Sequence, residues 1–259
     1  MNINSKISGI HHITAIASSA AENLAFYEKV LGLRLVKKTV NFDNPYTYHL
    51  YYGNSAGAPG TILTFFPWGK LPRGNNGAGM VISTSFSTPT DSLDYWRKRF
   101  KMHGIETKEI ERFGDRVIQF EDRHGLSLEL IGIPPGSSTA NLKSGPVSPA
   151  DGIIGIHSAT ALLHSLEETR FLLVDVMGMA LHAKEANRYR FKMESDDSFG
   201  YFYDVVADAR AQNGGQGGGT VHHIAFRTPT DEGQKYWQKS LRDSGISVTQ
   251  IRDRKYFKS

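Results

Sequence analysis

The chain has 259 residues, of which 39% are hydrophobic and 22% are charged, and it is long enough to form two domains with cores of their own. It contains no cysteine, which excludes disulfide bonds and thiolate metal ligands and leaves histidine and carboxylate side chains to hold any metal ion. Its net charge of +4 comes from scattered basic residues, and it has neither an apolar run of about 20 residues nor a signal peptide, so we expect a cytoplasmic protein without nucleic-acid or membrane partners.

The first predicted elements are a strand, a helix and two further strands. The segment GIHHITAIA, at residues 9–17, alternates β-branched residues and predicts a strand. A helix is expected at residues 22–31, where Gly32 ends it, and strands follow at 46–52 and 61–66.

The same order of elements repeats along the chain. The phrase FSTPTD (residues 86–91) followed by Tyr-Trp returns as FRTPTD (residues 226–231) followed by Tyr-Trp, and each copy predicts a strand, a proline-marked turn and an amphipathic helix. A third copy starts near residue 153, with a helix at 166–176 and a strand at 201–206. The chain therefore reads as four units of strand, helix and several strands.

Stretches rich in glycine and proline separate these units. The best linker, at 133–149, predicts one domain at residues 8–133 with units one and two, and another at residues 150–259 with units three and four. A second flexible stretch is expected at 212–219. The aromatic loop at 65–79 either walls a pocket or serves as a solvated connector.

Histidine pairs stand in the first strands of the first and fourth units. His11 and His12 lie in GIHHITAI, and His222 and His223 lie in TVHHIAF. Two remote strands of similar sequence that both offer imidazole predict one metal site assembled by a duplicated fold. Because neighbouring side chains of a strand point to opposite faces, both members of a pair reach the interior only where the strand bulges.

A βαβββ unit repeated four times, with HHI in the first strand of some copies, resembles the vicinal oxygen chelate superfamily, which includes glyoxalases, bleomycin resistance proteins and extradiol dioxygenases. The phrases GIHHITAI, LGLRLVKKTVNFDNPYTYHLYYG, GAPGTILTFFPW and GTVHHIAF further resemble bacterial ring-cleaving dioxygenases that act on hydroquinones. The resemblance covers nearly the whole chain. It implies an α+β fold in which four βαβββ modules pair into two half-barrels, with the fourth module incomplete in the given sequence.

The resemblance also implies the metal ligands. In these relatives the second histidine of each pair binds the metal, which corresponds to His12 and His223, and the implied metal is Fe(II), with Mn(II) as the alternative. His11 and His222 become catalytic candidates that could move a proton or stabilise superoxide. Modules two and three lack the pair, so the metal barrel is expected from modules one and four.

Two substrate-binding positions are carried over in the same way. Thr14 lies two residues beyond His12, on the same strand face, and matches a substrate-pocket position. Arg254 matches an arginine close to the substrate, although it could equally be a solvated charge in a basic tail.

A third metal ligand is the open point. Glu129 of module two stands where the superfamily places a metal-binding glutamate in its metal-bearing modules, and projection onto module four puts that glutamate roughly a dozen residues beyond Ser259. Either the given sequence omits this residue or the protein is a truncated relative. Glu129 itself is expected to serve packing or the surface. His157 is expected to be a structural or surface histidine, and His49 to lie in the core or at its rim.

The function implied by the resemblance is an Fe(II)-dependent extradiol-type ring-cleaving dioxygenase acting on hydroquinone or catechol-like aromatics, with dioxygen as the second substrate. No organic cofactor is implied, because no glycine-rich phosphate loop follows a strand and opens a helix. Two alternatives remain open: a glyoxalase-type metal isomerase, and a metal-free small-molecule-binding or resistance protein. The oligomeric state, including a homo-oligomer, is not determined by the sequence.

Overall fold

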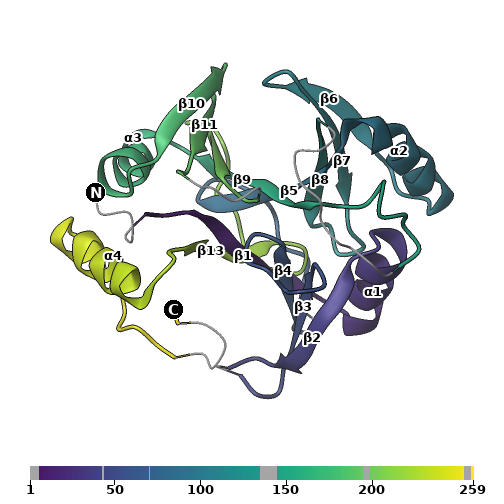
Figure 1. The fold of residues 1–259 in the computed structure, drawn as a ribbon, viewed down its shortest axis with the longest axis horizontal. Helices are drawn as coiled ribbons and strands as arrows, with labels where there is room; N and C mark the ends of the chain where they lie inside the picture. Colours follow the sequence, from purple (N-terminus) through teal and green to yellow (C-terminus); the bar gives the residue numbers. More distant parts are fainter. Residues whose placement is uncertain (1–5, 43, 70, 135–144, 195–198, 254–257) are drawn as a thin grey trace.

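The computed structural model describes residues 6–42, 44–69, 71–134, 145–194, 199–253 and 258–259. These residues form two sheets, with the helices at the periphery of the molecule (Figure 1). No helix within these ranges is long and apolar enough to cross a membrane.

The modules follow one another in the order that the repeated phrases predict. Module one consists of β1 (Gly9–Ala17), α1 (Ala20–Leu24) with a π-helical continuation (η2, Ala25–Val30), β2 (Arg34–Val40), β3 (Tyr48–Gly53) and β4 (Ile62–Pro67). Module two consists of β5 (Met80–Pro89), η3 (Thr90–Ser92), α2 (Leu93–Met102), β6 (Lys108–Arg112), β7 (Asp115–Glu121) and β8 (Ser127–Ile133). Module three consists of β9 (Gly155–Leu163), α3 (Glu167–Arg170), η4 (Phe171–Val176), β10 (Ala180–Glu185), β11 (Arg188–Lys192) and β12 (Phe202–Ala207). The described part of module four consists of β13 (Val221–Arg227) and α4 (Asp231–Asp243).

Local sequence explains where two of the helices begin. The hydroxyl of Ser19 accepts a hydrogen bond from the backbone N–H of Glu22 at the start of α1. Thr230 does the same for the N–H of Gly233 at the start of α4. Such caps satisfy N–H groups that have no partner within the helix.

The predicted α+β class is confirmed, and the observed element bounds differ from the predicted ones by only a few residues.

The two sheets share one plan. The smaller sheet has the strand order β13-β1-β4-β3-β2, so it joins the first strand of module four to module one. The larger sheet has the order β10-β11-β12-β9-β5-β8-β7-β6 and joins modules three and two. In each sheet the first strands of two modules lie antiparallel, β1 with β13 and β9 with β5. Positions in one sheet therefore have counterparts in the other.

Aromatic side chains fill much of the core. The helices contribute to this core. Apolar residues of α1 and η2 in module one, and of α2 in module two, pack against the buried faces of the strands. The largest fully buried side chains are Trp96, Tyr27, Tyr52, Phe65, Phe86, Phe100 and Phe191. Burial of such rings supplies much of the hydrophobic stabilisation of a domain.

Two glycine-rich loops pair with each other. Isolated bridges join Arg73 to Gly218 and Asn75 to Gly215. The backbones approach so closely that a Cβ on Gly77 would lie 2.4 Å from the nitrogen of Gly214. The stretch at 212–219, which the sequence predicts to be flexible, is therefore held in place by the loop between β4 and β5. Glycine is required at position 77, because a side chain there would collide with backbone atoms.

Candidate metal centre

The two histidine pairs meet where β1 lies beside β13. The Nε2 atoms of His12 and His223 lie 3.3 Å apart, although 211 residues separate them in sequence. Two nitrogen ligands about 2.1 Å from one metal ion, at an angle of about 90–110°, lie about 3.0–3.4 Å from each other. The spacing of these two imidazoles therefore fits two ligands of one ion.

Each strand carries a bulge at the first histidine of its pair. On β1 the register shifts between Ile10 and His12, and the opposite shift falls between Thr14 and Ala15, where β13 passes from His223 to Val221. His11 and His222 are thus the extra residues of two bulges, which is the backbone device that lets both members of a pair lie on one side of a strand. The Nδ1 atoms of His11 and His12 are 2.9 Å apart, and those of His222 and His223 are 2.8 Å apart.

A chain of hydroxyl and imidazole groups leads away from His223. Thr14 Oγ1 lies 3.1 Å from His223 Nε2 and 2.8 Å from Thr64 Oγ1. Thr64 Oγ1 in turn lies 2.9 Å from His49 Nε2, whose ring also contacts the hydroxyl of Tyr51 at 2.8 Å through Nδ1. The sequence predicts a packing or rim position for His49. Its place in this network could have been suspected only from its alternation with Tyr51 on one face of β3.

An aromatic wall stands beside the histidine cluster, which consists of His11, His12, His222 and His223. The rings of Phe66 and Trp68 stack with centroids 5.6 Å apart and an interplanar angle of 8°. Both meet His222 edge to face, at 5.5 and 5.6 Å. Of the two readings of the aromatic loop, the structure favours a wall, because Trp68 lies against a histidine of the cluster rather than alone in solvent.

The surroundings keep the imidazoles neutral. Burial, together with the charges of His11 and His223, holds the pKa of His12 well below its usual range. Burial and the charge of Arg227 lower the pKa of His11, burial lowers that of His222, and burial with His223 lowers the pKa of His49 to about 3. A neutral imidazole offers a lone pair, which is the form that binds metal ions.

The cluster brings together two imidazoles at a spacing that fits one ion, and a two-histidine, one-carboxylate site would require a further group. Within the described ranges, no three or more His, Cys, Asp or Glu side chains come together as a metal-binding group. Of the sequence-predicted site residues, His11, His12, Thr14, His222 and His223 lie together. Arg254 lies outside the described residues.

In the larger sheet, serine residues stand at the positions that correspond to His12 and His223. Alignment of FSTPTD with FRTPTD puts Ser83 at the position of His223, and alignment of GIHSATA with GIHHITA puts Ser158 at the position of His12. His157, the counterpart of His11, is 4% exposed and its Nδ1 lies 3.0 Å from Ser158 Oγ. It serves packing, as the sequence predicts.

Glu129 is committed to a buried ion pair in the larger sheet. The Nη1 and Nη2 atoms of Arg112 donate to its two carboxylate oxygens at 2.7 and 2.8 Å. Ser85 and Gln119 donate to the same carboxylate at 2.6 and 2.8 Å. Glu129 thus has a structural role on β8, next to β5, as the sequence predicts.

Known proteins share both the sequence and the fold. Residues 9–130 match the family model of the Glyoxalase/Bleomycin resistance protein/Dioxygenase superfamily. The protein named "Putative ring-cleaving dioxygenase MhqO" of Bacillus subtilis (strain 168) is 43% identical over 252 residues, which are 97% of this chain and 80% of the relative. "Chlorohydroquinone/hydroquinone 1,2-dioxygenase" of Sphingobium indicum is 30% identical over 268 residues, which cover 100% of this chain and 83% of the relative.

Solved structures share the fold of this chain. A Bacillus subtilis crystal structure, 43% identical, superposes with a TM-score of 0.92 and covers 98% of this chain and 81% of that one. Glyoxalase I from Zea mays, only 12% identical, has a TM-score of 0.67, with 94% and 83% of the two chains covered, and so shares the fold alone. The fold defines a protein of the vicinal oxygen chelate class. The chain belongs to the glyoxalase/bleomycin resistance protein/dioxygenase superfamily, and its similar relatives are named as ring-cleaving dioxygenases.

Proposed function

We propose that the protein is an Fe(II)-dependent extradiol-type ring-cleaving dioxygenase that acts on hydroquinone or catechol-like aromatics, with Mn(II) as the alternative metal. The observation that carries the proposal is the 3.3 Å approach of His12 Nε2 to His223 Nε2 from two remote strands. The name of the Sphingobium relative supports the substrate class. A cytoplasmic location belongs to the same proposal.

His12 and His223 would hold the metal through Nε2. When bound, the ion would supply adjacent coordination positions for a substrate oxygen and for dioxygen, and a route for electrons between them. The aromatic wall of Phe66 and Trp68 would bind the ring of the substrate beside His222.

The first histidine of each pair would orient the second. If Nε2 of His12 binds the metal, its Nδ1 carries the proton and donates to Nδ1 of His11, 2.9 Å away. His11 then keeps its own proton on Nε2, where it can donate to an oxygen atom of the reacting molecules. The same reasoning applies to His222 and His223, whose Nδ1 atoms are 2.8 Å apart.

Thr14 would border the substrate oxygen. Its hydroxyl lies 3.1 Å from His223 Nε2, next to the proposed metal position, and the contact with Thr64 Oγ1 at 2.8 Å would hold it there. The role proposed for Arg254 rests on the resemblance alone.

A third ligand would come from a strand beside β13. In the larger sheet β5 pairs with both β9 and β8, and β8 carries Glu129. Its counterpart β13 pairs with β1 and ends the smaller sheet within the described residues. A carboxylate on a strand along that edge would complete the two-histidine, one-carboxylate set that Fe(II) enzymes of this type use.

Oxygen uptake tests the proposal. Protein loaded anaerobically with Fe(II) is expected to consume about one dioxygen per hydroquinone, and His12→Ala and His223→Ala should each lose the iron and the activity. His182→Ala, at an exposed histidine on β10, is the matched control and should behave as wild type. Turnover of a thiohemiacetal without oxygen would instead identify a glyoxalase-type isomerase, and the proposal would be wrong.

A further inference from the structure

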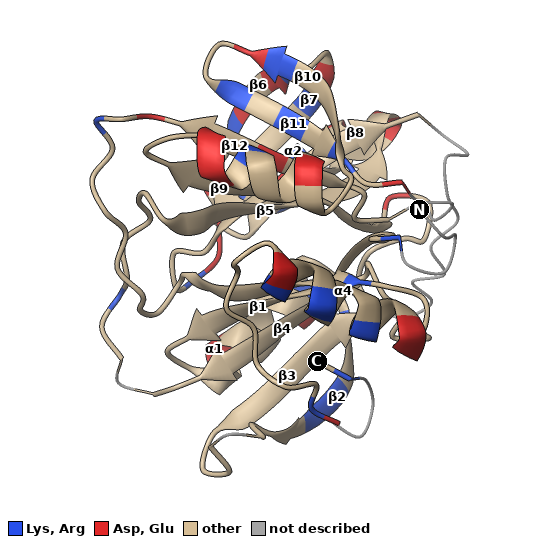
Figure 2. Ribbon diagram, turned by 90° about the vertical axis from the view of Figure 1, so that its left-hand side faces the viewer, with Lys and Arg blue, Asp and Glu red and all other residues tan. Residues whose placement is uncertain are grey.

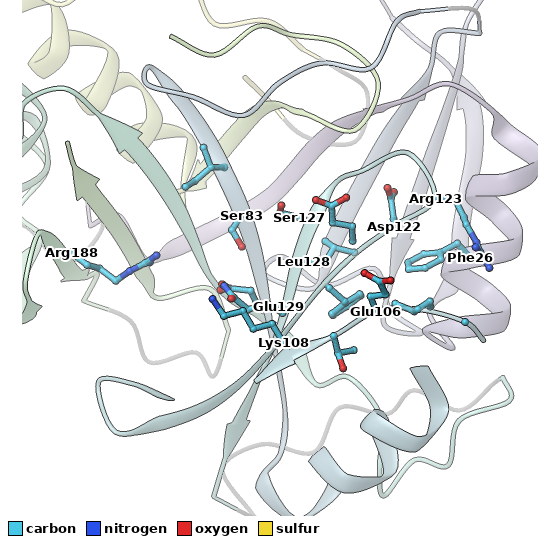
Figure 3. Close-up of a pocket in the computed structure, with 17 residues that line it drawn as sticks. Phe26, Ser83, Glu106, Lys108, Asp122, Arg123, Ser127, Leu128, Glu129 and Arg188 are labelled. Atoms are coloured by element: carbon cyan, nitrogen blue, oxygen red, sulfur yellow. The ribbon is translucent and has the colours of Figure 1, made fainter. Parts of the chain in front are cut away.

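A cavity, distinct from the histidine cluster, opens on the larger sheet. It has a volume of about 640 Å³ and is lined by residues of β5, β7, β8 and β11, by residues 104–108 and by Phe26 (Figure 3). Its lining includes Ile82, Ser83, Gln119, Leu128, Glu129 and Arg188. Cavities of this size hold small organic molecules.

The cavity occupies the position that corresponds to the metal centre. Ser83 is the counterpart of His223 by alignment of the repeats. Thr160 pairs with Asp204 on β12 as Thr14 pairs with Thr64 on β4. The cavity in the larger sheet contains no histidine among its lining residues within the described part of the chain.

An arginine also lines this cavity. Lysine and arginine residues lie along β10 and β11 at one end of the molecule (Figure 2), and β11 alone carries Arg188, Arg190 and Lys192. Arg188 points toward Ser83 and Glu129 in the close-up (Figure 3). Its side chain is 18% exposed, so it can be reached from the cavity while being largely shielded from solvent.

Arg188 is held in place and still has donors to offer. Its Nη1 donates to Thr160 Oγ1 at 2.9 Å and to Asp204 at 3.2 Å. Its Nε and Nη2 have no partner within the described residues. Ser83 lies opposite Thr160 in the β5–β9 ladder, and its buried hydroxyl likewise has no partner there. A buried polar group without a partner is costly, so two adjacent sets of donors indicate a ligand with acceptor oxygens.

The acids that border the cavity are already neutralised or exposed. Glu129 accepts both guanidinium donors of Arg112. Asp122 accepts from Tyr27 and from two backbone N–H groups, and Glu121 pairs with Arg73. Glu106 and Lys108, both exposed at the mouth, have opposite charges. None of these acids accepts a hydrogen bond from Arg188 within the described residues, so they do not occupy its Nε and Nη2 donors.

We propose that this cavity binds a small organic carboxylate with an apolar body. The carboxylate would accept from Arg188 and Ser83, and the apolar body would pack against Ile82 and Leu128. Burial, followed by the charge of Arg112, lowers the pKa of Arg188, while Asp204 and Glu129 act in the opposite direction. The proposal does not depend on the dioxygenase activity.

Calorimetric titration of metal-free protein with benzoate tests it. Benzoate is expected to bind, whereas benzamide, which has the same shape without the charge, should bind at least about tenfold more weakly because the charge-assisted bonds are lost. Equal affinity for the two compounds, or no detectable binding of benzoate, would overturn the proposal. This comparison needs no variant.

Variants then place the benzoate. Arg188→Gln should weaken benzoate binding about tenfold or more, and Asp204 keeps its two bonds to Arg190 in that variant, so the sheet should persist. Ser83→Ala, which removes the unpartnered hydroxyl, should weaken binding to a smaller extent. Arg116→Gln is the matched control, because this exposed arginine of the same sheet lies outside the cavity.

The histidine cluster gives the last discrimination. A His12→Ala and His223→Ala double variant should bind benzoate as wild type does. Loss of binding in this variant, or unchanged binding in Arg188→Gln, would assign benzoate to the histidine cluster and contradict the proposal.

Discussion

Arg227 joins the two histidine-bearing strands: from β13, its Nη1 donates to the carbonyl oxygen of Ile10 on β1 at 3.1 Å. Its Nη2 donates to two further backbone carbonyls at 3.0 and 3.2 Å. Glycine makes room for the guanidinium, because a Cβ on Gly9 would lie 2.8 Å from Nη2 and one on Gly60 would lie 2.6 Å from Nη1. Ile10 directly precedes the first histidine pair, so this arginine fixes the two pairs relative to each other.

Replacement of Arg227 by Gln is expected to lower the free energy of unfolding by about 2–4 kcal/mol, because buried carbonyls lose charge-assisted hydrogen bonds. Urea unfolding measures this change. Arg210→Gln, at an exposed arginine, should stay within about 0.5 kcal/mol of wild type. Equal stability of the two variants would show that Arg227 does not tie the strands together.

Removal of His11 should weaken metal binding without abolishing it. Because His11 accepts from Nδ1 of His12 in the proposed site, His11→Ala is expected to reduce Fe(II) affinity about 10- to 100-fold. His12→Ala, which removes a ligand, should reduce it further. Anaerobic metal titration of both variants measures the difference, and an affinity of His11→Ala equal to that of wild type would exclude an orienting role.

The buried pair of Arg112 and Glu129 should make the larger sheet sensitive to acid. Burial alone would raise the pKa of Glu129, but the hydrogen bonds and charge of Arg112, with Ser85 and Gln119, lower it from 4.5 to about 2. Since the folded-state pKa is depressed, the pair stabilises the fold above pH 4.5, and this contribution is lost as the pH falls toward 2.

Glu129→Gln tests this linkage. At pH 7 the variant leaves a buried guanidinium without its counter-charge and should lose about 3–5 kcal/mol of unfolding free energy. The difference from wild type should shrink below pH 4.5, where the unfolded wild-type chain takes up the proton. Glu121→Gln, which breaks the exposed pair with Arg73, should cost no more than about 1 kcal/mol. A pH-independent difference would show that the carboxylate does not titrate as stated.

Much of the fold could be predicted from the sequence because its signals are local and repeated. The FSTPTD and FRTPTD phrases and the glycines after each helix mark element boundaries, and the matching strands around His12 and His223 identify the duplication. Repetition of a strand signature does not by itself give side-chain distances. The 3.3 Å spacing depends on the bulges at His11 and His222, which shift the register of both strands.

Other parts of the site depend on contacts that no local pattern encodes. Thr64 links Thr14 to His49 because β1 and β3 both lie beside β4, an order that follows from the whole sheet. The ion pair of Arg112 and Glu129 likewise joins β6 to β8, which are separated by β7 in the sheet. In the sequence nothing distinguishes Arg112 and Glu129, which are 17 residues apart, from charged residues on the surface.

Gly77 should be intolerant of any side chain. A Cβ there would lie 2.4 Å from the nitrogen of Gly214 and 2.5 Å from the carbonyl oxygen of Gln212, both backbone atoms that cannot move alone. Gly77→Ala is therefore expected to destabilise the protein by about 1–3 kcal/mol, by forcing apart the loops that follow β4 and precede β13. Gly215→Ala is the matched control, because its Cβ would meet only the side-chain Oδ1 of Asn75, at 2.7 Å, which can rotate away. Thermal unfolding should place Gly77→Ala clearly below Gly215→Ala, and the reverse order would mean that the loops separate without cost.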